Sequence, residues 1–161
     1  RGYYQAIIND KTKQYHEGTV DITGKGNAYI IIDGFEEDVF IPFNKINKAF
    51  HRDTVQVYVY PRRKGKKLEG EIISITHRFK TTFVGVIEIQ DRFAFVKIAD
   101  FRMYTDFFIS QQGINEAKNG DKVVVELKNW EQNSSSPEGK IIQVLVRRYT
   151  PAVSWSNPYR L

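Results

Sequence analysis

The chain of 161 residues contains no cysteine and a single methionine. The absence of cysteine excludes a disulfide framework, a thiolate metal site and a cysteine nucleophile, and it is compatible with a reducing compartment. No apolar run approaches the roughly 20 residues of a transmembrane helix, and the first ten residues lack the central apolar region of a signal peptide. We therefore expect a cytoplasmic protein with no membrane partner. Because the chain starts with Arg1 and not methionine, we also expect a fragment or a processed product.

Side-chain groups that support catalysis are scarce as well. The chain has no Ser/His/Asp signature and no phosphate-cradling glycine loop. Its three histidines, His16, His51 and His77, fall on separate strands or loops, where structural or surface roles are expected. The acidic residues within 33–38 lie in a turn with no histidine nearby, which favours a solvated turn over a metal site. We therefore predict no catalytic residue, no metal ligand and no cofactor in this chain.

An excess of positive charge is missing from most of the sequence. The net charge is +5, but residues 16–77 hold nine Lys or Arg against nine Asp or Glu, and residues 80–146 hold eight against nine. The basic surplus lies at the two ends and between these ranges. A uniformly basic coat for nucleic acid is therefore excluded, and any attraction to phosphate must come from local patches.

Aromatic and β-branched residues are plentiful, with 11 Phe, 9 Tyr and 2 Trp. In the first half they fall in short apolar or alternating runs that are bounded by Gly, Pro, Asn or Asp, a pattern typical of strands. Only residues 44–50 look helical. Five runs are predicted as strands: residues 18–23, 26–33, 38–43, 53–60 and 68–76.

The strand pattern then occurs a second time. Asp38 to Pro42 matches Asp106 to Ser110, and three further pairs stand at offsets of 67, 68 and 69 residues. These pairs are Gly18 with Gly85, Asp53 with Asp121, and Gly70 with Gly139. Four matches in the same order indicate a tandem duplication. A unit of ~65 residues is too long for a solenoid repeat and suits one small closed β-domain.

Each copy supplies five strands and one short irregular segment between the third and the fourth. Five antiparallel strands with this insert fit an OB-fold, a Greek-key barrel, and an SH3-like barrel is the structural alternative. We therefore predict an all-β chain of two tandem five-stranded OB barrels, at residues 16–77 and 80–146. Residues 1–15 are expected to be a linker or an upstream remnant, and residues 147–161 a C-terminal tail.

Strand alternation places aromatic side chains on the outer face of both copies. Tyr29 and Phe40 point outward in the first copy, and Phe93, Phe95 and Phe108 do so in the second. Outward aromatic rings on neighbouring strands form a stacking platform for nucleic-acid bases. The alternative is that these rings are covered by other parts of the protein.

The same segments resemble the ribonucleoprotein motifs of cold-shock domains. Residues 25–30, KGNAYI, resemble the first motif, K-G-F-G-F-I, and residues 39–43, VFIPF, resemble the second, V-F-V-H-F. Residues 91–96 and 107–111 stand at the same places in the second copy. Two such domains in succession, with a basic loop before the last strand of the first, look like the N-terminal region of bacterial ribonuclease R, of the ribonuclease II family.

This resemblance implies two cold-shock-like OB domains that bind single-stranded RNA for a 3′–5′ exoribonuclease. It also implies a later catalytic domain, absent from this chain, in which clustered Asp residues hold Mg²⁺. That domain would be the partner of this fragment, which we expect to be monomeric. The chain departs from the cold-shock pattern where Asn27 replaces the first aromatic residue, and where Pro42 and Ser110 replace a histidine.

A basic run in the first copy completes the predicted site. Residues 62–67 lie between the last two predicted strands, where the corresponding loop of an OB-fold meets its ligand; a solvated loop is the alternative. The predicted RNA-binding residues are Lys25, Tyr29, Phe40, Phe43, Arg62, Arg63, Lys64, Lys66, Lys67, Phe93, Phe95, Lys97 and Phe108. A protein-interaction module built on the same aromatic residues is the alternative function, and the near-neutral charge of both copies favours it.

Overall fold

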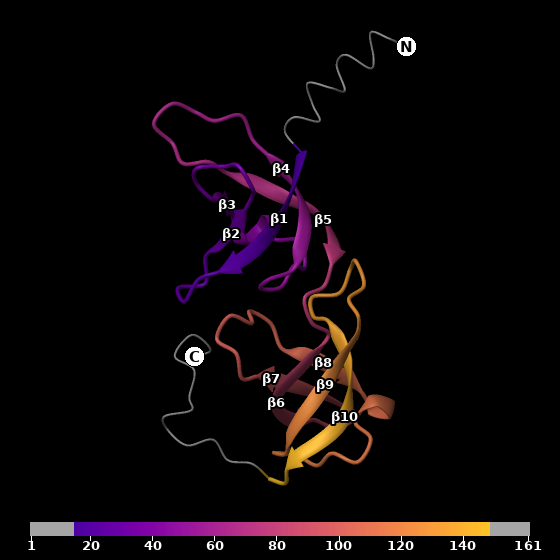
Figure 1. The fold of residues 1–161 in the computed structure, drawn as a ribbon. Coiled ribbons are helices and arrows are strands. Elements are labelled where there is room, and N and C mark those ends of the chain that lie inside the picture. The colour runs from indigo at the N-terminus through magenta and orange to yellow at the C-terminus, as the bar shows by residue number, and fades with distance from the viewer. Residues whose placement is uncertain (1–14, 149–161) are drawn as a thin grey trace. The chain divides into compact units, whose positions relative to one another are not determined.

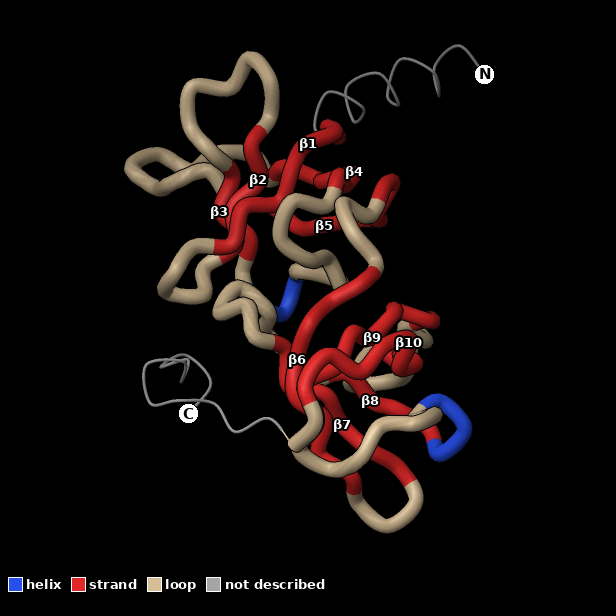
Figure 2. The backbone as a smooth tube through the Cα atoms, turned by 60° about the horizontal axis from the view of Figure 1, so that its bottom comes forward, coloured by secondary structure: helices blue, strands red, loops and turns tan. Residues whose placement is uncertain are grey.

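A computed structural model of the chain describes residues 15–148 (Figures 1 and 2). These residues form strands and turns almost throughout, and contacts divide the chain into two compact units at residues 79 and 80. We call them the first and the second domain and describe each by itself. Residues 1–14 of the predicted linker and 149–161 of the predicted tail lie outside the described residues.

The first domain is a curled antiparallel sheet with the strand order β3-β2-β1-β4-β5. A 3₁₀ turn, η1 (Phe43–Lys45), follows the third strand. The strands are β1 (Tyr15–Ile22), β2 (Ala28–Ile31), β3 (Val39–Ile41), β4 (Thr54–Val59) and β5 (Gly70–His77).

The second domain repeats this order as a closed barrel, β10-β8-β7-β6-β9. Its 3₁₀ turn, η2 (Gln111–Gly113), again follows the third strand, and Figure 2 shows both turns in blue. The strands are β6 (Thr82–Ile89), β7 (Phe93–Ile98), β8 (Phe107–Ser110), β9 (Lys122–Asn129) and β10 (Glu138–Val146).

The third strand approaches the fifth in both domains, although only the second domain forms a closed barrel. In the second domain, β8 and β10 pair in parallel, and the Phe108 N–H donates to the Pro137 carbonyl at 2.8 Å. In the first domain, a single parallel bridge joins Phe40 to Glu69, and the Phe40 N–H donates to the Leu68 carbonyl at 2.9 Å. The third strand thus lies beside the fifth in each domain, as in an OB-fold, and the predicted OB architecture is confirmed over the SH3-like alternative.

The core of each domain follows the predicted alternation. In the first domain, Val55 and Val57 of β4 are fully buried with Ile30 of β2, and in the second, Ala94 and Val96 of β7 are buried in the same way. Burying each such Val or Ile side chain contributes about 1.5–3 kcal/mol. One face of each strand therefore holds the barrel together, which leaves the other face available for function.

The predicted helical segment over residues 44–50 is wrong beyond its first turn. After η1, Asn47 and Lys48 adopt positive φ angles of 51° and 69°, a left-handed backbone that ends the helix. The Asn47 side-chain amide instead donates to the carbonyl oxygens of Ile72 and Ile73, at 3.2 and 3.0 Å. The side chain thus ties the segment to β5, and this bond replaces a further helical turn.

The glycines of the repeat lie where strands approach each other closely. A Cβ at Gly85 would collide with the carbonyl oxygen of Lys97 on β7, and one at Gly70 would collide with that of Tyr58 on β4. Gly18 and Gly139, the partners of these two in the other copy, are equally crowded. These positions exclude any side chain, which explains why the same residue stands there in both copies.

The matched aspartates, Asp53 and Asp121, are almost fully buried and fasten the end of each domain. Asp53 accepts hydrogen bonds from the backbone N–H groups of Phe50 and Phe79, at 2.8 and 3.0 Å. It also pairs with the Arg78 guanidinium at 2.7 Å. The carboxylate therefore joins the segment before β4 to the chain that leaves β5.

Asp121 repeats these bonds in the second domain. It accepts from the backbone N–H groups of Lys118 and Arg148, at 2.8 and 2.6 Å, and pairs with Arg147 at 3.2 Å. Burial alone would raise the pKa of Asp121, but the two N–H groups and the guanidinium outweigh burial and lower it. The carboxylate therefore stays ionised and keeps all three partners.

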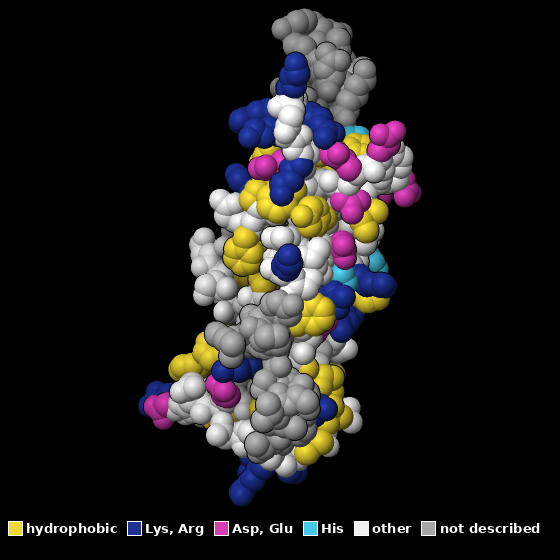
Figure 3. Space-filling view, turned by 90° about the vertical axis from the view of Figure 1, so that its left-hand side faces the viewer, with side chains coloured by type: hydrophobic (Ala, Val, Ile, Leu, Met, Phe, Trp, Pro, Cys, Tyr) yellow, Lys and Arg dark blue, Asp and Glu magenta, His cyan; other side chains and the backbone are white. Residues whose placement is uncertain are grey.

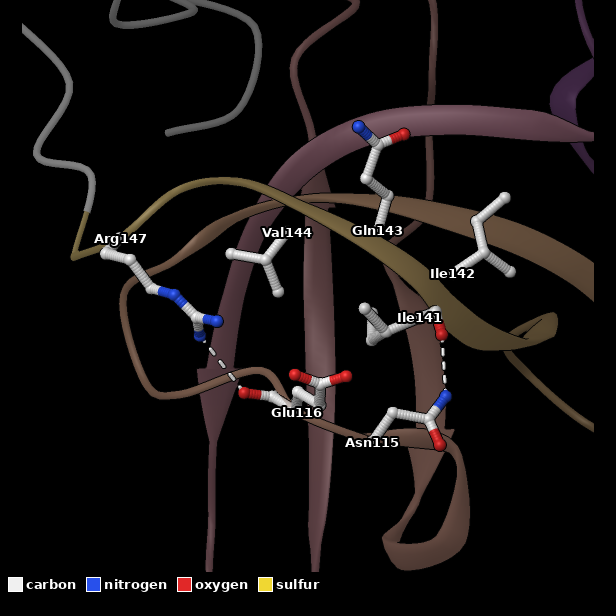
Figure 4. A pocket seen from close by; sticks show the side chains of 7 residues that line it. All are labelled: Asn115, Glu116, Ile141, Ile142, Gln143, Val144 and Arg147. Atoms are coloured by element: carbon white, nitrogen blue, oxygen red, sulfur yellow. Dashed lines mark hydrogen bonds between the residues drawn. The ribbon is translucent and has the colours of Figure 1, made fainter.

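A hollow of about 460 Å³ lies between β10 and the segment after η2, and Arg147 is among its lining residues (Figure 4). Arg147 donates to the Glu116 carbonyl at 3.1 Å, and the Asn115 amide donates to the Ile141 carbonyl at 2.6 Å. Asn115, at φ 54°, repeats the role of Asn47. The polar groups that line the hollow thus serve the fold.

Candidate nucleic-acid interface

Three phenylalanine rings form the larger aromatic surface, on β7 and β8 of the second domain. Phe95 lies directly opposite Phe108 in the strand register, with ring centroids 5.8 Å apart. Phe93 lies 5.7 Å from each of the other two rings, stacked on Phe108 and edge-on to Phe95. All three rings are half-buried. The two on β7 lie on the outer face, because alternation along that strand points Ala94 and Val96 into the core. We call Phe93, Phe95 and Phe108 the second-domain platform.

The first domain carries a smaller surface at the same place. Tyr29 on β2 lies opposite Phe40 on β3, with ring centroids 5.6 Å apart, and both rings are half-buried. The Lys67 ammonium lies 3.8 Å from the centre of the Phe40 ring, within cation–π range. Asn27 is exposed at the position where the second domain has Phe93. We call Tyr29 and Phe40 the first-domain platform.

The basic run lies in the loop between β4 and β5, which we call the basic loop (residues 62–67). Figure 3 shows lysine and arginine side chains gathered at one end of the first domain, next to hydrophobic side chains. Arg62 pairs with Glu37 at 3.0 Å, and this hydrogen bond lowers the pKa of Glu37. Arg63, Lys64 and Lys66 are exposed, and in residues 15–148 they form no ion pair. They are the cations of the loop that remain available to an anion.

The remaining predicted residues lie apart from the two platforms. Lys25 is exposed in the turn before β2. Phe43 lies past the end of β3, as the first residue of η1, and is 64% exposed. Lys97 lies on β7 but pairs with Glu88 of β6 at 3.2 Å, between two half-exposed side chains. Such a surface pair contributes little to stability, so an anion can displace Glu88 at small cost.

Sequence reasoning missed several aromatic residues. Tyr58 and Tyr60 alternate with the buried valines of β4, so the pattern that located the core also placed these rings outside. In the second domain, Tyr104 before β8 lies 6.3 Å from Trp130 after β9. No sequence signal links these two rings, because they meet only when β9 and β8 are both in place.

Two classes of feature are absent from the part of the chain that the structure describes. No group of three or more His, Cys, Asp or Glu side chains could hold a metal ion there. No helix within residues 15–148 is long and apolar enough to cross a membrane. The candidate interface that the structure describes consists of aromatic rings and exposed cations.

Family models match both halves of the chain. Residues 18–75 match the ribonuclease B OB domain, and residues 95–156 match the cold shock domain. Ribonuclease R of Thermotoga maritima is 30% identical over 146 residues, which are 90% of this chain and 20% of that protein. Ribonuclease R of Aquifex aeolicus is 31% identical over 84% of this chain and 20% of its own length. The chain thus spans about a fifth of the relatives it matches.

Two solved structures share the fold of this chain. Mycoplasma genitalium RNase R in its apo form has a TM-score of 0.72 at 15% identity, over 82% of this chain and 22% of that one. Yeast Ssd1, described as a pseudonuclease, has a TM-score of 0.74 at 17% identity, over 91% of this chain and 25% of that one. Residues 18–75 are thus similar to a ribonuclease B OB domain and residues 95–156 to a cold shock domain, and together they are similar to about a fifth of ribonuclease R.

Proposed function

We propose that the chain binds single-stranded RNA, as the substrate-binding N-terminal part of a ribonuclease R-like 3′–5′ exoribonuclease. The observation that carries this proposal is the recurrence of an aromatic platform on the second and third strands of both domains. Duplicated cores explain duplicated valines and isoleucines, but they do not require half-buried rings on the outer face. Rings kept at the same place in both copies are explained by a ligand with flat π faces.

The geometry suits unpaired bases. Stacking on an aromatic side chain is worth about 1–3 kcal/mol per base and is tolerant of sequence. Phe93 and Phe108 are stacked with their ring planes inclined by 30°, and Phe95 stands edge-on beside them. Phosphates of the same strand would contact Lys97 in the second domain, and Lys25, Arg63 and Lys64 in the first. Binding is therefore expected to be nearly independent of sequence and to weaken as salt rises.

A solved relative supports RNA as the ligand. Mycoplasma genitalium RNase R, which shares the fold at a TM-score of 0.72 and 15% identity, has a structure in complex with ribose methylated single-stranded RNA. We place hydrolysis itself in a separate catalytic domain of the parent protein, with Mg²⁺ held there by clustered Asp residues. In this proposal the described chain grips RNA and passes it to that domain, in the cytoplasm.

The test is a binding titration of fluorescently labelled oligo-U with the double variant Phe93→Ala, Phe108→Ala. We expect the affinity to fall by about 10- to 100-fold, because two stacking surfaces are removed. Ile142→Ala is the matched control, since Ile142 is an exposed apolar residue on β10 outside the platform. Circular dichroism and thermal melting verify the fold. An unchanged affinity in the folded double variant would refute stacking on this platform.

A protein-interaction module is the second candidate, and the near-neutral charge of both domains favours it. In that case the platforms would be contact surfaces for another domain or subunit. Size-exclusion chromatography of the chain alone separates the two candidates. RNA binding by a monomer supports our proposal, whereas self-association without RNA binding supports the alternative.

A further inference from the structure

A hollow of about 690 Å³ lies on the outer side of β4, below the basic loop. It is separate from the first-domain platform, which lies on β2 and β3. Neither the repeat nor the cold-shock motifs point to it. The residues that define it are Tyr58, Tyr60, Arg63, Lys66, Lys67 and Glu69.

Three tyrosine rings form a continuous row along this side of the domain. Tyr15 on β1 pairs directly with Tyr58 on β4, with ring centroids 5.0 Å apart. Tyr60 follows at 5.7 Å from Tyr58. Tyr15 and Tyr58 also line a second hollow of about 400 Å³, so the two hollows share the Tyr58 ring. We call Tyr15, Tyr58 and Tyr60 the tyrosine row.

Tyr60 is held in place by its neighbour on β5. Its hydroxyl donates a hydrogen bond to Glu71 Oε1 at 2.7 Å. Burial, followed by this bond to Glu71, raises the pKa of Tyr60 to about 12. The phenol therefore stays neutral at physiological pH, and its ring offers a fixed face that does not repel an anion.

The charge of the hollow selects the kind of ligand. Arg62, which pairs with Glu37, lines it together with Arg63, Lys66 and Lys67. These last three cations stand against one lining carboxylate, Glu69, so an anion is favoured. An acidic peptide would satisfy these cations but leave the row of ring faces unused. A nucleotide uses both, because its base stacks on a ring while its phosphate meets the cations.

We propose that the tyrosine row and the basic loop form a second track for single-stranded RNA, an inference that rests on the proposed function. Lys67 joins the track to the first-domain platform, because it lines the hollow and also lies 3.8 Å from the Phe40 ring centre. A strand that leaves the platform at Phe40 meets this ammonium and then reaches Tyr60 and Tyr58. The basic loop thus serves two faces of one barrel.

The track is tested with Tyr58→Ala against Tyr58→Phe, which keeps the ring. Labelled oligo-U is titrated at about 5 and about 20 nucleotides, lengths that bracket the roughly 4–16 nucleotides that one OB-fold covers. We expect Tyr58→Ala to weaken binding of the long oligonucleotide about fivefold or more and to leave the short one unchanged, because the short one occupies the second-domain platform. Tyr58→Phe should behave as wild type for both.

Photocrosslinking of oligo-U that contains 4-thiouridine gives a second measurement that needs no folded variant. Mass spectrometry of wild-type protein should identify crosslinks at Tyr58 or Tyr60. Binding by wild type with neither a crosslink at these residues nor an effect of Tyr58→Ala would overturn the track and leave the proposed function intact. Wild-type protein that binds no RNA would overturn both. Displacement of RNA from Tyr58 by a polyglutamate peptide that binds more tightly would point to an acidic protein partner instead.

Discussion

The two domains differ most at the loop before the last strand and on the outer face of the second and third strands. The first domain has five cations in the basic loop and two platform rings, whereas residues 130–137 of the second contain no Lys or Arg and its platform has three rings. The buried residues show no such divergence: Asp53 and Asp121 keep the same set of partners. The duplicated scaffold is thus the same in the two domains while their surfaces differ, one richer in cations and the other in aromatic rings.

This division has a physical advantage for a sequence-independent ligand. Stacking supplies affinity at short range and resists salt, whereas cations act over about 8–10 Å at physiological ionic strength. A chain that places the two on successive domains can attract a strand at one and hold it at the other. The predictions below test whether the two domains share their scaffold and differ in their surfaces.

The largest effect is expected at the buried aspartates. Asp53→Ala should destabilise the first domain by roughly 3–5 kcal/mol, because it leaves Arg78, only 20% exposed, without its charge partner. Asp121→Ala should cost the second domain less, about 2–3 kcal/mol, because Arg147 is 57% exposed and can turn to water while the two N–H groups lose their acceptor. Urea denaturation measures both losses.

The two unfolding transitions can be separated in one sample. Trp130 lies in the second domain, so tryptophan fluorescence follows that domain when Trp155 is replaced by Phe, while circular dichroism follows both domains. Asp33→Ala and Asp91→Ala, which remove exposed carboxylates, are the controls and should change stability by less than about 0.5 kcal/mol. Equal losses at Asp53 and Asp121 would contradict the effect that we assign to arginine burial.

Asp121 also makes the second domain sensitive to acid. Because its pKa is lowered in the folded state, its contribution is fully present above the unfolded value of about 3.9 and is lost as pH falls through the lower folded value. Urea midpoints followed by tryptophan fluorescence should therefore drop below about pH 4 in wild type. In Asp121→Asn the drop should be smaller, since no carboxylate remains there to titrate. An identical pH profile in the variant would exclude Asp121 as the source.

The scaffold could be predicted from the sequence because its determinants are local or repeated. Alternation along residues 53–60 assigned Val55, Val57 and Val59 to the core, and the matched glycines and aspartates gave the duplication. The bonds from Asp53 to Arg78 could not be predicted, because they join residues 25 positions apart whose approach depends on how β5 ends. The prediction of a helix over residues 44–50 was wrong for a related reason, because the Asn47 side chain bonds to β5 and not to its own segment.

Part of the candidate site could be predicted from the sequence in the same way. Alternation identified both platforms, and the structure brings their rings together as neighbours. The alternation pattern could not show that Lys97 pairs with Glu88 or that Arg62 pairs with Glu37, because such pairs depend on strand register and on the path of the loop. Tyr58 was missed although its outward direction followed from the same alternation. A ring on the fourth strand matches no cold-shock motif, so a search guided by those motifs passes over it.

Among the surface changes, loss of the second-domain platform should weaken RNA binding most. Phe93→Ala with Phe108→Ala should lower the affinity for oligo-U by about 10- to 100-fold, whereas Tyr29→Ala with Phe40→Ala should lower it only about fivefold. The difference follows from the ring geometry, because Phe93 and Phe108 are stacked with their planes 30° apart, whereas Tyr29 and Phe40 meet edge-on at 62°. Equal losses, measured by fluorescence anisotropy in folded variants, would show that the domains stack bases equally well.

Neutralising the basic loop should change the salt dependence more than the affinity at a single salt concentration. The triple variant Arg63→Gln, Lys64→Gln, Lys66→Gln should reduce the slope of log affinity against log salt by up to about 2, since each phosphate contact on a single strand contributes about 0.7. Lys118→Gln, Lys128→Gln, Lys140→Gln removes the same charge from the second domain and should leave the slope nearly unchanged. A similar reduction in both triple variants would mean that net charge, and not the loop, attracts the RNA.

The smallest effect is expected from a substitution of Asn27 that should raise the affinity for RNA. It is also the most direct test of the difference between the two domains. This residue is exposed, and its backbone bonds to Thr23, at 2.8 and 3.2 Å, do not involve its side chain. Asn27→Phe therefore places a ring where the second domain has Phe93, next to the first-domain platform, and should raise the affinity for oligo-U by about fivefold, or about 1 kcal/mol. Asn27→Ala is the control for loss of the amide, and anisotropy titrations at one salt concentration measure both. If the phenylalanine variant binds no better than the alanine variant, a ring at this position receives no base, and the first domain differs from the second in the path of the RNA and not only in its side chains.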